Sequence, residues 1–389
     1  MLTVLLYLNY KIYYQPEYIT KEGIKINKEV FLQQQYLRQQ LQKGAGKKMQ
    51  AEYPEGFVFM HALYGLSRAS IAKQSPPGSD LFKESLIEVD RSIEEIRSDY
   101  GKNPFDENLP LPYGAFYNGW LNYLVSKRLE CDTTDQELKN LFISNCREIK
   151  NVLDKSDSPY LETYYSQVWP ADVSLCIASL AIHDKIFYPQ YTTTIQRWLN
   201  QIKANLDSHG LIPHSANYIT GKATEKSRGS SQSLLLNFLI EIDTAFAKQQ
   251  YSIYKKHFLE YTFGLPGIRE YPIGETGEGD IDSGPVILNI GPAATIVGRK
   301  TCESFQDSKL AMEIRNGIEA FGFPVKKHDQ KKYLAGMLPI ADAFIVWSNT
   351  EDNLNYIPQN PYITFHSYSL AILLLLSFVT WRVLVFKWK

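Results

Sequence analysis

The segment YGAFYNGWLNYLVSK (113–127) is followed by TTDQELKNLFISNCREIKNVLD (133–154), and this pair sets a pattern that recurs along the chain. The first segment is apolar and rich in small and aromatic residues, which is typical of a helix that is shielded on all sides. The second segment places its apolar residues at helical spacing among charged ones, which is typical of a helix with one wet face. The pair therefore predicts a helical hairpin with an inner and an outer member.

The same alternation of inner and outer segments recurs at intervals of about 50–60 residues, which is a repeat of supersecondary size. Inner-type segments occur at 55–72, 113–127, 166–184, 228–243, 282–298 and 339–348. Outer-type segments occur at 79–100, 133–154, 192–207, 247–261 and 307–321, and 26–43 supplies a sixth. We therefore predict an all-α fold, an (α/α)6 toroid of helical hairpins over residues 26–355. An open α-solenoid is the alternative, which the long Gly/Pro loops fit less well.

Composition and charge exclude several classes of protein. The 389 residues are 44% hydrophobic, and 41 Lys and Arg balance 42 Asp and Glu, for a net charge of −1. Without a cationic excess the chain is not a nucleic-acid binder held by a broad basic field, and its apolar content excludes a disordered protein. Cys131, Cys146, Cys176 and Cys302 are scattered and the histidines show no metal-binding spacing, so we predict no metal and no cofactor.

The C-terminal segment YITFHSYSLAILLLLSFVT (362–380) carries no Asp, Glu, Lys or Arg and has aromatic residues at both ends. It is about long enough to cross a bilayer, so we predict a transmembrane helix over 360–386. A buried C-terminal core helix is the alternative. The N-terminal segment 1–25 begins with a short apolar run that is too short to span as it stands, and it is a candidate for a truncated signal or anchor.

The charges that flank the predicted span indicate its orientation. Arg382 follows the span, and residues 387–389 form a basic tail, whereas Asp342, Glu351 and Asp352 precede the span. The positive-inside rule then places the C-terminus in the cytoplasm and the main domain outside.

The helical pattern resembles the (α/α)6 toroid of the six-hairpin glycosidases and is similar to that of the linalool dehydratase/isomerase family, which uses the same barrel. The resemblance covers residues of about 50–350 and rests on the architecture. It implies a site at the end of the funnel where the inner helices begin. It also implies a catalytic Asp or an aromatic platform at the start of the third inner helix.

The richest candidate for that site is GETGEGDIDSGP (274–285), which runs into the fifth inner segment. Its glycines permit close backbone approach to a ligand, and its carboxylates are suited to general acid–base catalysis. We expect Glu278, Asp280 and Asp282 to be catalytic and Glu275 to bind substrate, with Asp282 or Ser283 capping the helix. A purely structural acidic loop is the alternative.

A second candidate is the start of the third inner segment, WPAD (169–172). An indole beside a carboxylate suits a sugar ring, because the indole stacks on the apolar face of the ring and the acid transfers a proton. We therefore expect Asp172 to be catalytic and Trp169 to bind substrate. A capping Asp with a core Trp is the alternative.

The remaining candidate residues are distributed over the other inner segments. His214, Arg228 and Gln232 lie at the fourth inner segment, where Arg228 and the start of a helix predict an anion site. His61, Tyr64 and Arg68 share one helix face, so we expect His61 to be catalytic and Tyr64 to bind substrate from a cavity-facing position. Three further residues are expected to bind substrate: Tyr117, Trp120 and Asp342.

Together these observations favour a membrane-anchored toroid enzyme that acts on a carbohydrate, as a glycoside hydrolase or a lyase, by carboxylate catalysis. One alternative is a hydro-lyase like linalool dehydratase/isomerase, acting on a small alcohol or lipid, for which the resemblance implies a thiol such as Cys176. The other is a non-catalytic toroid that binds a glycan or a partner protein.

Overall fold

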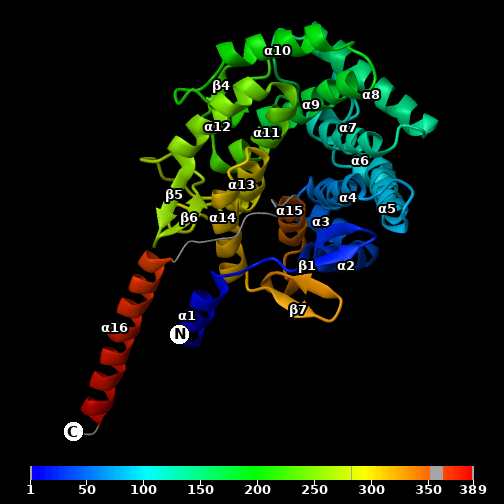
Figure 1. Cartoon of the computed structure of the whole chain (residues 1–389). Helices are drawn as coiled ribbons and strands as arrows, with labels where there is room; N and C mark the ends of the chain where they lie inside the picture. Colours follow the sequence, from blue (N-terminus) through cyan, green and yellow to red (C-terminus); the bar gives the residue numbers. More distant parts are fainter. Residues whose placement is uncertain (1, 282, 351–361, 388–389) are drawn as a thin grey trace.

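The computed structural model describes residues 2–281, 283–350 and 362–387. Within these residues six inner helices form a ring in which each packs on the next and the last packs on the first (Figure 1). The inner helices are α4 (Gly56–Gln74), α7 (Gly114–Cys131), α9 (Pro170–Ile186), α11 (Gly229–Ile242), α13 (Pro292–Ser304) and α15 (Pro339–Asn349). The contact between α15 and α4 closes the ring, so the architecture is a toroid and not an open solenoid.

Six outer helices surround this ring. They are α2 (Lys28–Gln42), α5 (Asp80–Arg97), α8 (Gln136–Lys155), α10 (Thr192–Ala204), α12 (Thr244–Phe258) and α14 (Ser308–Phe321). α2 packs against both α4 and α15 and so covers the seam where the ring closes. The predicted (α/α)6 toroid is therefore confirmed, including the sixth outer helix near the N-terminus.

The outer helices follow the predicted amphipathic pattern. In α8 the buried side chains recur at helical spacing, at Leu138, Phe142, Cys146, Ile149 and Leu153. The inner helices are instead buried around most of their circumference, because an outer helix covers one side and the ring interior the other.

The connections at the two ends of the ring differ in length. The loops from an inner to the following outer helix are short, at 75–79, 132–135, 187–191, 243 and 305–307. The loops that lead into an inner helix are longer, at 43–55, 98–113, 156–169, 205–228, 259–291 and 322–338. We call the end where the inner helices begin the mouth and the opposite end the base.

The smaller elements lie mainly in the connections. Four antiparallel two-stranded hairpins are present: β1 (Tyr18–Lys21) with β2 (Ile24–Asn27), β3 (Ser215–Ala216) with β4 (Ala223–Glu225), β5 (Leu259–Thr262) with β6 (Leu265–Ile268), and β7 (Val325–Lys327) with β8 (Gln330–Lys332). The short helices are α1 (Leu2–Lys11), α3 (Ala45–Glu52), α6 (Asp99–Lys102) and the 3-10 turn η1 (Leu334–Gly336). The hairpins have strands of four residues or fewer, which are too short to give a clear period in the sequence.

The fifth inner helix begins ten residues later than predicted. α13 starts at Pro292 after an N-cap at Gly291, so Ser283 lies in the preceding loop, and Asp282 falls outside the described residues. The expectation that one of them caps the helix is wrong for Ser283, whose Oγ instead accepts a hydrogen bond from the Asp280 backbone N–H at 2.9 Å. Proline favours the first position of a helix, and left-handed backbone at Leu288 and Asn289 prevents an earlier start.

Aromatic side chains fill the middle of the ring. Trp120 is fully buried, and its ring centroid lies 5.2 Å from that of Phe59, 5.8 Å from Phe238 and 6.3 Å from Trp347. These residues belong to α7, α4, α11 and α15, so four inner helices meet through one cluster. Any site in the ring must therefore lie above this aromatic cluster, at the mouth, or below it, at the base.

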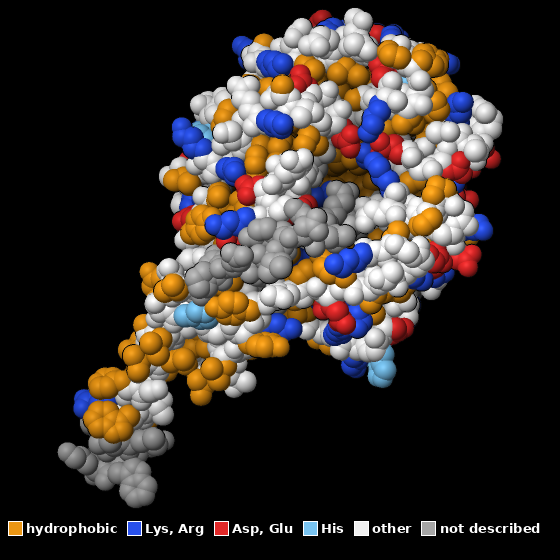
Figure 2. Space-filling model, in the orientation of Figure 1, with side chains coloured by type: hydrophobic (Ala, Val, Ile, Leu, Met, Phe, Trp, Pro, Cys, Tyr) orange, Lys and Arg blue, Asp and Glu red, His pale blue; other side chains and the backbone are white. Residues whose placement is uncertain are grey.

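The last helix, α16 (Ile363–Lys387), projects from the toroid (Figures 1 and 2). Among the described residues, its first turns pack on the toroid and its later turns do not: Phe365 is buried, whereas Leu374 is 63% exposed and Trp381 is 57% exposed. Residues Ile363–Val383 have a mean hydropathy of 1.7 and are long and apolar enough to cross a membrane. The alternative of a buried core helix does not hold for this segment.

Candidate functional site

The long loop before α13 brings a carboxylate to the start of α11 at the mouth. The Glu270 carboxylate accepts hydrogen bonds from the Ser230 backbone N–H at 3.2 Å and from the Ser230 Oγ at 2.7 Å. A Cβ atom on Gly291 would lie 2.9 Å from the Glu270 Oε2, so glycine leaves room for this carboxylate. The N-terminus of α11 thus already has an anionic partner from within the chain.

Glu270 is fully buried, and this burial raises the pKa of its carboxyl group to about 7 in spite of the Ser230 hydrogen bonds. Glu270 is not among the residues expected from the sequence, because it stands before the glycine-rich run 274–285. It is the carboxylate that directly precedes this run, and that position is the signal that would have included it.

Arg228 links the acidic loop to the start of α11. Its Nε donates to Glu225 Oε1 at 2.6 Å, its Nη1 donates to Asp280 Oδ2, and its guanidinium lies over the ring of Tyr271. Two carboxylates therefore already neutralise Arg228. The expectation that Arg228 and the helix start form an open anion site is not met, because Asp280 and Glu270 take those positions.

His214 lies on the same side of the mouth. Its Nδ1 is hydrogen-bonded to Ser231 Oγ, and its Nε2 lies 3.8 Å from Glu225 Oε2. Burial, together with the positive charge of Arg228, lowers the pKa of His214 to about 4, so the ring is neutral near pH 7.

The environment moves the pKa values of two carboxyl groups around Arg228 in opposite directions. Burial holds Glu270 near 7, so that it is protonated about half the time at neutral pH. Burial alone would raise the pKa of Asp280, but hydrogen bonds from the Ser283 backbone and from Arg228 outweigh it and lower that pKa. Two neighbouring carboxyls with separated pKa values are the usual arrangement for a proton donor and a proton acceptor in one site.

Asp172 and Trp169 occupy the start of the neighbouring inner helix, α9, as predicted. Asp172 Oδ2 accepts a hydrogen bond from Thr163 Oγ1 at 2.6 Å, and the side chain is 7% exposed. Trp169 is half-buried and packs edge-on against Tyr164, whose hydroxyl donates to Glu55. An indole and a carboxylate therefore both lie at the start of α9, at the mouth.

The two groups of residues share one rim of the mouth. The Ala216 backbone N–H donates to the Val168 carbonyl at 3.3 Å, which joins the β3–β4 hairpin to the residue before Trp169. The helices that follow, α9 and α11, pack side by side. The structure thus brings Asp172 and Trp169 onto loops adjoining those of His214, Arg228 and Asp280.

The other acidic residues of the loop are less enclosed. Glu275 pairs with Lys226 at 2.8 Å and lies 3.6 Å from His209 Nε2, at the edge of the mouth. Glu278 is exposed, and its backbone carbonyl accepts from the Tyr271 hydroxyl at 2.6 Å. Asp282 lies outside the described residues.

The polar face of α4 points away from the ring interior. Tyr64 donates to Glu88 Oε2 of α5 at 2.9 Å, and Arg68 lies 3.6 Å from Glu84 of the same outer helix. His61 packs against Phe57, and its Nε2 would lie 3.2 Å from a Cβ on Gly46 of α3. Burial lowers the pKa of His61 to about 3. The cavity-facing position expected for His61 and Tyr64 is therefore replaced by packing between α4, α3 and α5.

Three other predicted binding residues are enclosed in the packing of the ring. Trp120 belongs to the central aromatic cluster, and Tyr117, one turn nearer the mouth, is 3% exposed beside Phe105 and Tyr113. Gln232 is fully buried, and its Nε2 donates to the Ile212 carbonyl at 2.6 Å. Gln232 thus holds the loop that carries His214 rather than facing a ligand.

Asp342, in the first turn of α15, also faces away from the ring interior. Its Oδ1 accepts from the Tyr333 backbone N–H at 2.8 Å, whereas Oδ2 has no hydrogen-bond partner, and the side chain is fully buried. Burial raises its pKa to about 7. The expected contact with substrate is therefore replaced by a contact with the chain that enters α15.

The buried Asp342 predicts a pH-dependent stability. Because its pKa is 3.8 in a model peptide and about 7 in the fold, the folded state binds the proton more tightly, and the free energy of unfolding falls as pH rises from about 4 to about 7. Asp342→Asn should raise that free energy by about 2–4 kcal/mol at pH 8 and change it by less than about 1 kcal/mol at pH 4. Urea unfolding at both pH values measures this, with Glu148→Gln on the exposed face of α8 as control. An equal destabilisation at both pH values would contradict it.

Cys176 is fully buried between α9 and α7, where its Sγ lies 3.5 Å from the Ala115 carbonyl oxygen. Burial raises the pKa of this thiol well above its ordinary value. The thiol implied by the resemblance to linalool dehydratase/isomerase is therefore enclosed in packing.

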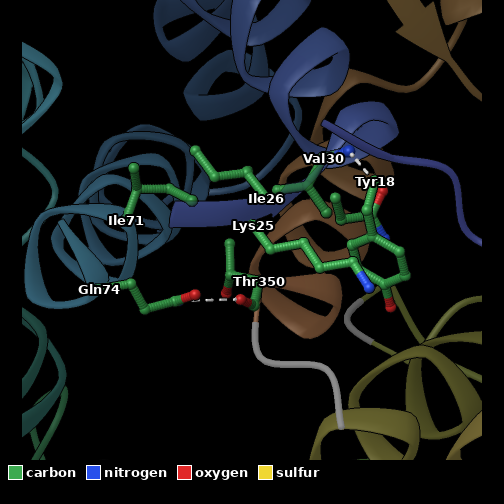
Figure 3. Close-up of a pocket in the computed structure, with 8 residues that line it drawn as sticks. Tyr18, Lys25, Ile26, Val30, Ile71, Gln74 and Thr350 are labelled. Atoms are coloured by element: carbon green, nitrogen blue, oxygen red, sulfur yellow. Dashed lines mark hydrogen bonds between the residues drawn. The ribbon is translucent and has the colours of Figure 1, made fainter. Parts of the chain in front are cut away.

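A small pocket of about 50 Å³ lies at the base, where α4 and α15 end (Figure 3). Gln74 Nε2 donates to the Thr350 carbonyl at 3.4 Å across it, and the Lys25 ammonium lies 4.8 Å from the Tyr18 ring centroid. No predicted site residue lines this pocket, and its volume suits a few water molecules. The mouth, with its carboxylates, is the better candidate for chemistry.

The fold and the mouth together define a helical toroid with an acidic rim. No protein-family model matches the chain, and no curated protein matches it. Among solved structures it is similar to a family 76 glycoside hydrolase, an α-mannanase of Bacteroides thetaiotaomicron, with 12% identity and a TM-score of 0.45 over 75% of this chain and 84% of that chain. A likeness at this level transfers no activity, so the candidate function depends on the side chains of this chain.

The start of α11 packs closely against the backbone at Arg269 and Glu270. This close packing predicts that a larger residue at Gly229 destabilises the fold. A Cβ on Gly229 would lie 1.8 Å from the Arg269 carbonyl oxygen, and the Gly229 N–H donates to the Glu270 carbonyl at 2.8 Å. Gly229→Ala should therefore displace the Glu270 segment and lower the free energy of unfolding by about 3 kcal/mol, measured by urea unfolding.

Gly317 in α14 provides the matched control, since a Cβ there meets no atom within 4 Å. Gly317→Ala should be neutral or stabilise the fold by up to about 1 kcal/mol. Equal effects of the two substitutions would contradict the close fit at Gly229.

Proposed function

We propose that this protein is a membrane-anchored toroid enzyme that hydrolyses a glycosidic bond at its mouth by carboxyl acid–base catalysis. The observation that carries the proposal is the pair of carboxyl groups Glu270 and Asp280 near Arg228. Their surroundings raise the pKa of Glu270 and lower that of Asp280. Such a pair supplies one protonated and one ionised carboxyl at neutral pH, which glycoside hydrolysis requires.

Asp280 is the proposed base. Its side chain is 43% exposed, and its lowered pKa keeps it ionised near pH 7. A water molecule that attacks the anomeric carbon gives its proton to the Asp280 carboxylate while the bond from that carbon to the leaving oxygen breaks.

Glu270 is the proposed source of the other proton. Because it is fully buried, it acts through Ser230, whose half-buried hydroxyl is 2.7 Å from Glu270 Oε1. The leaving oxygen takes a proton from the Ser230 hydroxyl, which takes one from the Glu270 carboxyl. The atoms balance as one water consumed and one glycosidic bond cleaved.

Trp169 and Asp172 form the proposed sugar-binding part of the rim. A half-buried indole presents an apolar face on which a pyranose ring can stack, and the adjacent carboxylate can accept hydrogen bonds from sugar hydroxyls. Hydrolysis is favoured over elimination from a uronate, because Arg228 is already paired with Glu225 and Asp280. The charge of Arg228 is therefore already balanced by two carboxylates of the chain.

The test is a screen for sugars released from a panel of oligosaccharides and polysaccharides by the purified full chain in detergent. Asp280→Asn should lower the release of reducing ends by at least about 100-fold. Glu148→Gln on α8, a carboxylate-to-amide change on the outer wall, should leave it unchanged. Cleavage that survives Asp280→Asn at the wild-type rate would remove the assignment.

The enclosure of Glu270 favours a second candidate, a non-catalytic toroid that binds a glycan at the same rim. In that case no member of the panel is cleaved, and one binds with an affinity that falls when Trp169 is replaced by alanine. Titration calorimetry on the same panel separates the two candidates.

The anchoring part of the proposal assigns α16 to the bilayer with the toroid outside and the C-terminus in the cytoplasm. It is supported by the exposure of the apolar side chains of α16 and by Arg382, Lys387 and Lys389 near the C-terminus. Protease digestion of sealed membrane vesicles tests the orientation, since the toroid should be cleaved only from the outer side.

A further inference from the structure

α1 is apolar on all sides, yet half of it is uncovered. Its sequence, LTVLLYLNYK, has no charged side chain before Lys11. Leu8 is buried against the toroid, whereas Leu2 and Leu6 are each 57% exposed and Val4 is 46% exposed. A helix that is hydrophobic all round belongs in a protein core or in lipid, and here one side has no protein cover in the described residues.

α1 lies against the first turns of α16 through specific contacts. Asn9 Oδ1 lies 2.6 Å from His366 Nδ1, and the Tyr13 hydroxyl lies 2.6 Å from His366 Nε2. The Tyr13 ring also packs edge-on against Tyr362, with centroids 5.5 Å apart. The start of α16 is therefore held by side chains from α1 and the turn that follows it.

Buried groups fix both segments to the outer helix α14. The Arg315 guanidinium lies 5.1 Å from the Tyr14 ring centroid in a cation–π contact, and Arg315 Nη2 donates to the Tyr14 hydroxyl at 3.3 Å. Asn316 donates to the Tyr362 hydroxyl at 2.9 Å. Since Arg315 and Asn316 are neighbours in one buried stretch, α1 and the start of α16 have a fixed direction relative to the toroid.

Exposed aromatic residues lie around the start of α16. Phe323 is 45% exposed and stacks on Tyr7 of α1, with centroids 5.6 Å apart. Phe263, at the tip of the β5–β6 hairpin, is 47% exposed and meets Tyr368 at 5.2 Å. Aromatic residues at the level where a span leaves its domain are typical of the membrane interface.

From these contacts we infer that α1 is a second membrane contact, with Leu2, Val4 and Leu6 in the same lipid leaflet that the first turns of α16 enter. The inference rests on the proposed anchoring by α16, beside which α1 lies (Figure 1). Lipid is the partner that covers this face, because the uncovered face of α1 is continuous with the exposed apolar surface of α16 and with the aromatic residues around the start of α16. Lys11, the charged residue of α1, is at its toroid end, where its stem can reach the headgroups.

The consequence is a fixed orientation of the toroid relative to the membrane. A single span would let the domain rotate about the axis of that helix, whereas two adjacent contacts tied to α14 hold it in one orientation. The mouth then keeps a constant direction relative to the bilayer, which matters for a glycan substrate that is itself attached to a surface.

The test is depth-dependent fluorescence quenching on the full chain in lipid nanodiscs. In a Cys131→Ser background, where the other three cysteines are buried, Leu6→Cys, Ile219→Cys or Leu374→Cys carries an environment-sensitive fluorophore. These three positions are 57%, 61% and 63% exposed, so their side chains start from matched exposure. The nanodiscs contain lipid with a nitroxide on the upper part of the acyl chain.

The inference expects quenching of about twofold at residue 6 and at residue 374, and none at residue 219 on the β3–β4 loop. Quenching at residue 374 with none at residue 6 would overturn the contact by α1 while leaving the α16 anchor in place. No quenching at residue 374 would overturn the anchoring itself, and the inference with it.

Discussion

Replacing Glu270 by glutamine is expected to lower turnover of the cleaved glycan by at least about 100-fold. Glutamine keeps the size of the side chain, and its carbonyl oxygen can still accept the hydrogen bond from Ser230. What it loses is the exchangeable carboxyl proton. The expected result is therefore a loss of the rate of the chemical step with little change in substrate binding.

The pH dependence gives this variant a distinct signature. Wild-type turnover should fall as pH rises above about 7, because the Glu270 carboxyl loses its proton there. The residual turnover of Glu270→Gln should lack that decline. Steady-state rates from pH 5 to 9 measure both effects, and a Glu270→Gln variant with the wild-type rate and the wild-type pH profile would exclude Glu270 from proton transfer.

Replacing Trp120 by alanine is expected to lower the free energy of unfolding by about 4 kcal/mol. The indole is fully buried where α4, α7, α11 and α15 meet, so its removal leaves a cavity that four helices border. A closed ring relaxes poorly into such a cavity, because each inner helix is fixed by its two neighbours and by an outer helix.

Urea unfolding of the detergent-solubilised chain measures the Trp120→Ala effect, with Tyr188→Ala as the control. Tyr188 is 59% exposed on the outside of the toroid, so its removal should cost less than about 1 kcal/mol. A loss of similar size in both variants would contradict the role of Trp120 as the centre of the ring.

The helical plan could be predicted from the sequence because its signals are long. Outer helices such as α8 repeat one apolar stripe over several turns, and a polar Ser79 caps α5 by accepting from the Phe82 N–H at 3.2 Å. The alternation of these helices with apolar ones then leads directly to a ring of hairpins. The start of α13 was missed because an apolar run, 286–290, forms a loop held by left-handed residues.

The sequence could not predict which side chains of the inner helices point into the ring and which point toward the outer helices. α4 and α9 are buried on nearly every side, so their sequences contain no stripe that distinguishes the ring interior from the outer wall. His61, Tyr64 and Asp342 were assigned to a cavity because they are polar in apolar surroundings, but each is enclosed on the side away from the ring interior. Their partners, on α3, α5 and the chain before α15, are fixed only by the tertiary fold.

The candidate carboxylates were predictable in part for a similar reason. Asp172 and Asp280 stand at inner-helix starts or in a glycine-rich loop, which are local signals. Glu270 depends on a non-local one, the insertion of its carboxylate at Ser230, forty residues earlier in the chain. The sequence therefore indicated the acidic loop but not which carboxyl would be buried.

Azide rescue of Asp280→Ala is the most direct test of the proposed chemistry, on a glycan that the wild type cleaves. If Asp280 serves the reaction at the anomeric carbon, the variant is nearly inactive in water, and azide ion restores turnover with a glycosyl azide as product. If Asp280→Ala hydrolyses the glycan at the wild-type rate and azide yields no glycosyl azide, the mouth carboxylate does not take part, and the account is contradicted.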